Sequence, residues 1–327
     1  MIMQISSRLP RFDVAGISRY AVAVAFLLLL VFFSLASPSF LTPANLFNIL
    51  VNNVVLLAII AFGMTIVISA GGIDLSVGVS VDMASMVFIM LLAAGSGPVV
   101  AILVGLAAAL AVGLVNSVLI TRLRISPFLA TLGVLFIGQS VQQIATGGGQ
   151  PIYLVTGDVV KLFTAIVRTP VLGVPMSVII FAACGVVVYL LLHKSVFGRY
   201  VRAFGAQPGV AWYSGIRVPF NMSLVYIACA LLCGVAGILL SSTVRSYVPL
   251  SGNAFLLDAI GATFIGTTIS AERRPSVIGT LLGVALLAVV KNGLLLIGWN
   301  FYWQQVGIGV LVFLVLALSF GLRGRDH

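Results

Sequence analysis

The sequence predicts an all-α polytopic membrane protein with about ten transmembrane helices, forming a single domain over residues 1–327. Hydrophobic residues make up 61% of the chain and charged residues only 7%, whereas soluble domains are about 25% charged. A transmembrane helix needs about 20 apolar residues. Apolar runs near this length recur along the chain, at 20–36, 47–69, 75–94, 99–120, 127–146, 171–192, 220–242, 254–270, 276–298 and 304–321.

The positions of the basic residues predict how these helices are oriented. Of the 17 lysines and arginines, 13 fall in segments that would share one side of the membrane, 3 fall in segments on the other side, and Lys291 lies within a span. Cytoplasmic loops carry an excess of Lys and Arg. We therefore expect both termini, including residues 1–19, and segment 193–219 to be cytoplasmic. Segment 147–170 is expected to be periplasmic and to contain a short interfacial helix.

The first apolar run follows Arg8, Arg11 and Arg19 and precedes residues 35–38, LASP, which resemble a signal-peptide cleavage site. Because the run is longer than a usual signal sequence and more spans follow it, we expect an uncleaved first helix. Ten spans divide into two sets of five with opposite orientations. An inverted five-plus-five repeat, a common plan among transporters, is therefore expected.

The second run ends at residues 70–78, AGGIDLSVG, which we interpret as a break between two helices. The adjacent glycines permit backbone angles that other residues disfavour. Asp74 is of the residue type that caps helix N-termini, so it is expected to cap the helix that follows.

The longest polar interruption, residues 193–219, carries four basic residues and no acidic one. Within it, residues 207–214 are predicted to form a short helix that begins with Pro208 in its first turn and ends at Gly215. Such a helix between two spans is suited to contact a partner protein. A solvated loop whose cations only fix the orientation of the chain is the alternative.

The sequence contains no pattern typical of an enzyme. No glycine precedes a lysine, so a GxxxxGK[ST] nucleotide loop is absent, and the cysteines and histidines form no metal-binding pattern. Asp82 and Lys291 are the charges that fall inside predicted spans, and such charges mark functional sites. At ~1.5 Å per residue their heights differ by about 12 Å, which disfavours a pair. Lys291 is expected instead to reach the outer interface or to donate to carbonyls at a helix break.

Polar side chains in or near the spans are the candidates for a translocation path. Amides and hydroxyls exchange hydrogen bonds with a neutral, hydroxyl-rich solute without a charge barrier. Such side chains also bind helices to one another inside membranes, which is the alternative for each of them. The candidate residues are Asn52, Asn53, Asp74, Ser76, Gln139, Gln142, Gln143, Asp258 and Asn292, with Gln304 and Gln305 at the start of the last span.

Four groups of motifs resemble the permease subunit of sugar ABC importers of the ribose, xylose and galactose branch. They lie between about residues 40 and 320 and are GMT and GGIDLSVG (63–65, 71–78), PFLATL (127–132), GRYVRAFG with SGI (198–205, 214–216), and LDAI, GTLLG and WQQV (257–260, 279–283, 303–306). The resemblance implies a bacterial inner-membrane protein that imports a monosaccharide or related polyhydroxylated solute.

The resemblance also implies the partners and the division of labour. A second permease subunit, identical or homologous, two cytosolic ABC ATPases and a periplasmic sugar-binding protein would complete the importer, in contact with membrane lipids and without nucleic acid. ATP and Mg would bind to the ATPases, so this chain would be no enzyme and would hold no cofactor. ATPase coupling would involve Gly198, Arg199, Gly205, Gln207, Ala211, Trp212, Ser214 and Gly215.

The chain departs from the branch in two places. Residues 270–275, SAERRP, replace a glycine-rich turn, and Trp212 and Tyr213 stand where smaller or charged residues are commoner, which favours a dedicated ATPase. Two other functions remain open at this point, an ion-coupled carrier that uses Asp82 or Asp74 and a membrane scaffold without transport. The sequence does not identify the sugar.

Overall fold

The computed structural model describes residues 14–154, 158–171, 173–270 and 274–321, and each predicted apolar run forms a helical segment within them. Part of the predicted cytoplasmic N-terminus and part of the charged 270–275 turn lie outside the described residues. The main helices are α1 (Val14–Ala36), α2 (Pro43–Asn48), η1 (Ile49–Val54), α3 (Val55–Ser69), α4 (Val77–Ala93), α5 (Pro98–Thr121), α6 (Pro127–Ala145), α8 (Met176–Tyr189), η2 (Leu190–Lys194), α11 (Val218–Val244), α12 (Leu256–Ile269), α13 (Val277–Leu296) and α14 (Phe301–Gly321).

Short elements connect these helices. A ten-residue helix, α7 (Asp158–Val167), lies in the segment predicted to contain an interfacial helix. Two further short helices, α9 (Val196–Ala206) and α10 (Pro208–Tyr213), form the polar interruption. Strand β1 (Ile152–Tyr153) pairs with β4 (Ser246–Tyr247), β2 (Pro170–Val171) pairs with β3 (Val174–Pro175), and the 3-10 helix η3 (Ser251–Phe255) follows β4.

Six of the described helical segments are long and apolar enough to cross a membrane: Pro43–Ser69, Pro98–Thr121, Pro127–Ala145, Met176–Lys194, Val218–Val244 and Val277–Leu296. Three shorter apolar helices, Ala23–Ala36, Val77–Ala93 and Tyr302–Leu314, accompany them. The protein is therefore a mostly helical, multi-pass membrane protein. The number of ten spans stays a prediction.

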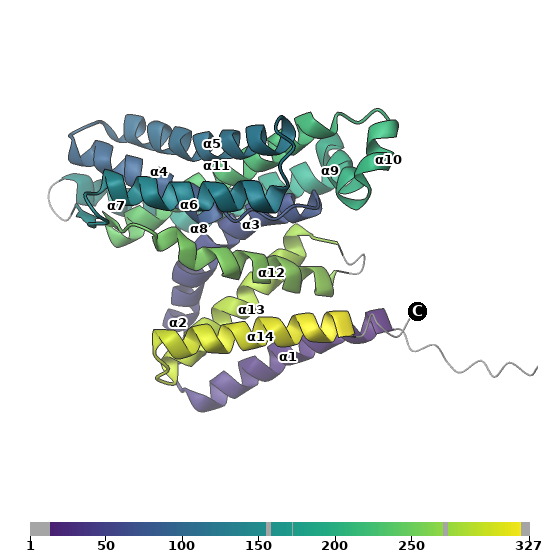
Figure 1. Cartoon of the computed structure of the whole chain (residues 1–327). Helices are drawn as coiled ribbons and strands as arrows, with labels where there is room; N and C mark the ends of the chain where they lie inside the picture. Colours follow the sequence, from purple (N-terminus) through teal and green to yellow (C-terminus); the bar gives the residue numbers. More distant parts are fainter. Residues whose placement is uncertain (1–13, 155–157, 172, 271–273, 322–327) are drawn as a thin grey trace, which may run out of the picture.

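Helix α3 occupies the centre of the molecule (Figure 1). Of its 15 residues, all except Ile68 are buried. A helix that is apolar on every side is stable only when other helices surround it. Helices α8, α11, α12 and α13 provide this surrounding surface.

The packing partners of α3 and α11 are exchanged between the two halves of the chain. Helix α11, from the second half, packs along α4 and α5, whereas α3, from the first half, packs against α12 and α13. Both α3 and α11 end in a break in the α-helix, and the chain then continues into α4 or α12. This exchange favours the predicted inverted repeat.

Figure 1 also shows where the short helices lie relative to the ends of the chain. The beginning of α1 and the end of α14 lie at the same end of the helices as α9 and α10, whereas α7 lies at the opposite end. The side of the membrane on which the termini and segment 193–219 lie stays a prediction.

Candidate functional site

The polar interruption folds into two short helices with identifiable caps. The Ser195 hydroxyl accepts a hydrogen bond from the Gly198 amide at 3.2 Å and caps α9. Helix α10 begins at Pro208, in the first-turn position predicted for it, and is flanked by Gln207 and Ser214. Gly215 follows with φ of 78°, which a residue without a Cβ adopts readily. The predicted short helix is thus confirmed.

Helix α10 presents two large aromatic side chains to its surroundings. Trp212 is 61% exposed and Tyr213 is 92% exposed, whereas Ala211 is the one residue of α10 that is buried. Among the other predicted coupling residues, Arg199, Gln207, Ser214 and Gly215 are exposed, and Gly198 and Gly205 face the protein. An exposed surface with aromatic and cationic side chains is suited to bind another protein.

Helix α9 contacts the break between α3 and α4 backbone to backbone. A Cβ atom added to Gly71 would lie 3.0 Å from the Gly205 carbonyl oxygen. A Cβ atom on Gly205 would collide with the Ser69 carbonyl oxygen and lie 3.0 Å from the Ala70 carbonyl carbon. The backbone of α9 at Gly205 thus packs directly on the backbone of residues 69–71, with no room for a side chain between them.

The break itself is held by a chain of buried polar groups. The Asp74 carboxylate accepts hydrogen bonds from the Ser76 amide at 2.8 Å and from the Ser76 hydroxyl at 2.6 Å. Asn116 of α5 donates to the Ser76 hydroxyl at 2.7 Å, and the Thr131 hydroxyl of α6 accepts from the Leu75 amide at 3.1 Å. The break is therefore tied to both α5 and α6.

The prediction that Asp74 caps the next helix is wrong. Ser76 occupies the N-cap position of α4 and makes no side-chain cap bond there. Two turn residues separate Asp74 from α4, so its carboxylate bonds within the turn before the helix starts. Sequence reasoning identified a suitable residue type but placed the start of the helix too early.

A second polar cluster joins α4 and α6 to the β4–η3 segment. Oδ1 of the buried Asp82 accepts hydrogen bonds from the Ser251 hydroxyl at 3.1 Å and from the Gly252 amide at 2.8 Å. Oε1 of the buried Gln142 accepts from the Tyr247 hydroxyl and from the Leu250 amide, each at 3.0 Å. Burial, with a smaller contribution from the charge of Asp82, raises the pKa of Tyr247, so its hydroxyl stays protonated and donates.

Three buried polar atoms of this second cluster have no protein partner among the described residues. They are Oδ2 of Asp82, Nε2 of Gln142 and Oδ1 of Asn253. Buried polar atoms are normally hydrogen-bonded. These three atoms are therefore able to form hydrogen bonds with water or with a solute hydroxyl. Gln142 was among the polar residues expected from the sequence, and of the three glutamines of α6 it is the one that is buried.

Lys291 forms an ion pair with Asp258 of α12. The expectation that Lys291 reaches the outer interface or donates to helix-break carbonyls is therefore wrong. The sequence argument correctly disfavoured Asp82 as its partner but did not consider Asp258, because the pairing of α12 with α13 is not visible in the sequence. Asp258 is 4% exposed and Lys291 is 27% exposed. The next residue, Asn292, exchanges two amide hydrogen bonds with Asn45 of α2, at 2.9 and 3.0 Å.

The predicted path residues do not converge on one site. Asp74 and Ser76 hold the break, whereas Asp258 and Asn292 pair with residues of neighbouring helices. Gln142 belongs to the second polar cluster. Four others lie apart: Asn52, exposed and bonded to Asn48, and Asn53 lie on η1, and the half-buried Gln139 and exposed Gln143 lie on the outer side of α6. Gln304 and Gln305 lie near the beginning of α14, where Gln304 donates to the Trp299 carbonyl at 2.8 Å. The hydrogen bonds between Asn292 and Asn45 join two helices, so for Asn292 the observed role is helix packing, the alternative given for each of these residues.

Comparisons with known proteins identify the family. A family model described as "Branched-chain amino acid transport system / permease component" matches residues 45–316. The chain belongs to this permease family. It is 34% identical to the ribose import permease protein RbsC of Bacillus subtilis (strain 168) over 292 residues, 89% of each chain. It is 29% identical to the D-allose transport system permease protein AlsC of Escherichia coli (strain K12) over 290 residues, 88% of this chain and 87% of that protein.

A third relative is the autoinducer 2 import system permease protein LsrD of Escherichia coli O9:H4 (strain HS), 32% identical over 279 residues, 85% of this chain and 84% of that protein. No solved structure matches the chain. All the predicted coupling and path residues fall within the matched range, 45–316. Membership of a family of permease components decides against the ion-coupled carrier and the scaffold.

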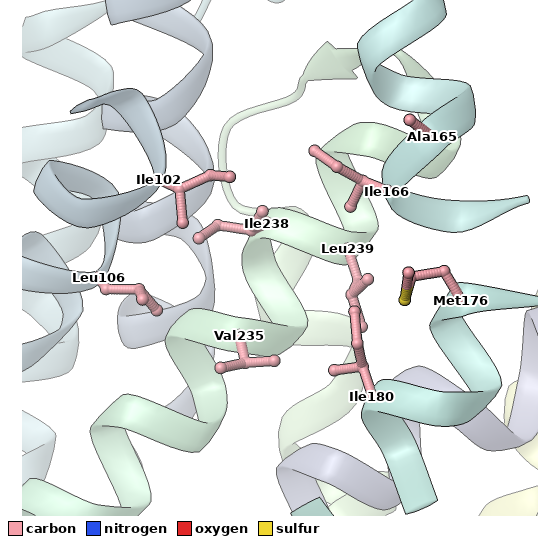
Figure 2. A pocket seen from close by; sticks show the side chains of 9 residues that line it. All are labelled: Ile102, Leu106, Ala165, Ile166, Met176, Ile180, Val235, Ile238 and Leu239. Carbon is pink, nitrogen blue, oxygen red and sulfur yellow. The ribbon is translucent and has the colours of Figure 1, made fainter. Parts of the chain in front are cut away.

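The permease also has an apolar pocket of about 340 Å³ between α5, α7, α8 and α11 (Figure 2). Its lining carries no hydrogen-bonding side chain, so it is unsuited to a sugar. The lining residues are Ile102, Leu106, Ala165, Ile166, Met176, Ile180, Val235, Ile238 and Leu239.

Proposed function

We propose that this permease is the transmembrane subunit of an ATP-binding-cassette importer that moves a monosaccharide or a related small polyhydroxylated solute into a bacterial cell. The named relatives import ribose, D-allose or autoinducer 2. Two of these three solutes are monosaccharides, which favours a sugar over the branched-chain amino acids in the description of the family model.

We propose that the complete importer has two permease subunits, two cytosolic ABC ATPases and a periplasmic sugar-binding protein, and resides in the inner membrane. In this arrangement ten helices span the bilayer, both termini and residues 193–219 are cytoplasmic, and 147–170 is periplasmic. The 13 basic residues of the predicted cytoplasmic segments support this orientation. The shared end of α1, α14, α9 and α10 is consistent with it (Figure 1).

The contact of α9 with the α3–α4 break carries the proposed mechanism. An ATPase that binds Trp212 and Tyr213 would move α10 and, with it, α9. Because Gly205 lies against the backbone of residues 69–71, this movement would change the angle between α3 and α4. The hydrogen bonds of Asp74, Ser76 and Asn116 would then carry the change to α5.

The second polar cluster would respond farther along α4, at Asp82, six residues after Ser76. Its hydrogen bonds hold the β4–η3 segment against Asp82 and Gln142. A rotation of α4 would loosen these bonds, and the three unpartnered atoms could then bind solute hydroxyls. We therefore place the solute path beside this cluster, which contains Gln142 but not the other amides expected from the sequence.

The test compares two glycine substitutions in the permease reconstituted with its ATPase and binding protein. Gly205→Ala inserts a methyl group into the contact between α9 and the break, whereas Gly133→Ala, on α6, meets nothing within 4 Å. We expect Gly205→Ala to reduce ATP-driven sugar uptake at least tenfold while the ATPase still co-purifies, and Gly133→Ala to leave uptake unchanged. Equal uptake by the two variants would contradict the proposed mechanism.

A second measurement tests the energy source. Liposomes that contain the permease alone, with a sodium or proton gradient and no ATPase, should accumulate no sugar. Accumulation under these conditions would overturn the proposed function itself, whatever the glycine variants do.

A further inference from the structure

A groove of about 410 Å³ lies where α5 ends and where α10 meets the beginning of α11. Its lining is mixed: mainly apolar side chains with one cation and one indole. The lining residues are Ile120, Thr121, Arg124, Trp212, Val218, Pro219 and Met222. The turn between α5 and α6 lies at the same end of the helices as α9 and α10 (Figure 1).

Arg124 occupies this groove in an unusual backbone conformation. Its φ is 58°, in the left-handed region that favours glycine. The hydrogen bonds of the flanking Leu123 and Ile125 amides to Val118 and Leu119, each 3.1 Å, close the end of α5 around it. A glycine would adopt this helix-ending conformation more easily. Arg124 thus occupies a strained backbone position where glycine would be favoured, and its guanidinium lies at the groove.

The surface around the groove is apolar as well as cationic. Leu123 and Phe220 are each 61% exposed, beside the exposed Arg122 and Arg217. On a multi-pass membrane protein, exposed apolar side chains face acyl chains, and an indole such as that of Trp212 prefers the boundary between acyl chains and headgroups. Apolar side chains next to cations therefore mark the level at which a phospholipid changes from tail to headgroup.

We propose that this groove binds an anionic phospholipid, with its phosphate on Arg124 and an acyl chain along Ile120, Val218 and Met222. A guanidinium is well matched to phosphate because it offers several N–H donors in one plane. The Thr121 hydroxyl donates to the Ser117 carbonyl at 2.7 Å. Of the other lining residues only Arg124 carries a positive charge, whereas Trp212 offers a neutral indole N–H.

The bound lipid would also contact the proposed coupling helix. Trp212 lines the groove and belongs to α10, so a lipid in the groove would pack against the same helix that the ATPase is proposed to move. The lipid composition of the membrane would then affect how α10 is held. This inference goes beyond the transport function and does not depend on which solute is carried.

The experiment uses Trp212 as a reporter in the full-length permease with Trp299→Phe and Trp303→Phe, reconstituted in phosphatidylcholine vesicles. Brominated acyl chains quench indole fluorescence on contact, so quenching by brominated phosphatidylglycerol is compared with quenching by brominated phosphatidylcholine at equal mole fraction. One cation near the surface is expected to favour the anionic lipid roughly fivefold in relative binding constant. Arg124→Gln and Arg124→Gly should both abolish this preference.

Two controls separate a specific site from a general charge effect and from misfolding. Arg122→Gln removes the same charge from the same turn but outside the groove lining, and it should keep the preference. Arg124→Gly removes the strained side chain, so its thermal stability should equal or exceed that of the parent. The proposal is overturned by equal quenching by the two lipids, by an equal effect of Arg122→Gln, or by loss of the preference when inorganic phosphate is added.

Discussion

The ion pair between Asp258 and Lys291 makes the most direct prediction about stability. Lys291→Met removes the cation and leaves the Asp258 carboxylate, which is 4% exposed, without its partner. Removing one member of a buried ion pair costs about 3–5 kcal/mol, because the other charge stays buried and uncompensated. Lys291 itself is 27% exposed, so we take the lower end of this range. About 3 kcal/mol corresponds to a roughly 100-fold lower ratio of folded to unfolded protein.

The assay is reversible unfolding in mixed micelles, followed by the loss of the helical circular dichroism signal as the fraction of denaturing detergent rises. The double variant Asp258→Asn, Lys291→Met replaces both charges with neutral side chains of similar size. It should recover most of the lost stability, because neutral replacement of a whole buried pair is often without net effect. Lys194→Met, at the exposed end of η2, is the control for loss of one lysine. If Lys291→Met were no less stable than the double variant, the reasoning would be refuted.

Two further predictions concern the polar cluster and the coupling helix. Asp82→Asn retains the oxygen that accepts hydrogen bonds from Ser251 and Gly252, so ATP-driven uptake should persist in a flux assay. Asp82→Leu leaves the Gly252 amide without its acceptor and should lower the free energy of unfolding by about 1–3 kcal/mol. Equal uptake and equal stability of the two variants would contradict the role of Asp82 as a hydrogen-bond acceptor. Combined Trp212→Ala and Tyr213→Ala should weaken ATPase binding by about 2 kcal/mol, measured by titration, without changing permease stability, since both side chains are exposed. Unchanged ATPase affinity would exclude the aromatic surface from the interface.

The positions of the helices could be predicted closely from the sequence. Apolar runs of about 20 residues predict spanning helices well, because a segment that crosses the bilayer must satisfy its own backbone hydrogen bonds and does so as a helix. The short helix α10 could also be predicted from the sequence. Proline favours the first turn of a helix and glycine favours its end, and both preferences depend only on the backbone angles of the residue itself. The permease family was likewise indicated by motifs that the family model then matched.

The contacts between helices could not be predicted in the same way. Lys291 pairs with Asp258 and Asn292 with Asn45 across 33 and 247 residues of chain. Gln142 and Gln143 are neighbours in sequence, but only the first faces Tyr247, because each residue of a helix is rotated by about 100° from the previous one. A list of polar residues therefore did not reveal which of them share a site.

The sequence by itself determined that this protein crosses a membrane many times, where its helices lie and to which family it belongs, because these properties depend on hydrophobicity and motifs that are local to the chain. Only the tertiary structure decided which buried charges and amides meet, and that Gly205 rests on the α3–α4 break. Those contacts depend on the angles and heights at which helices cross, and these are set by side-chain packing between segments that are distant in sequence.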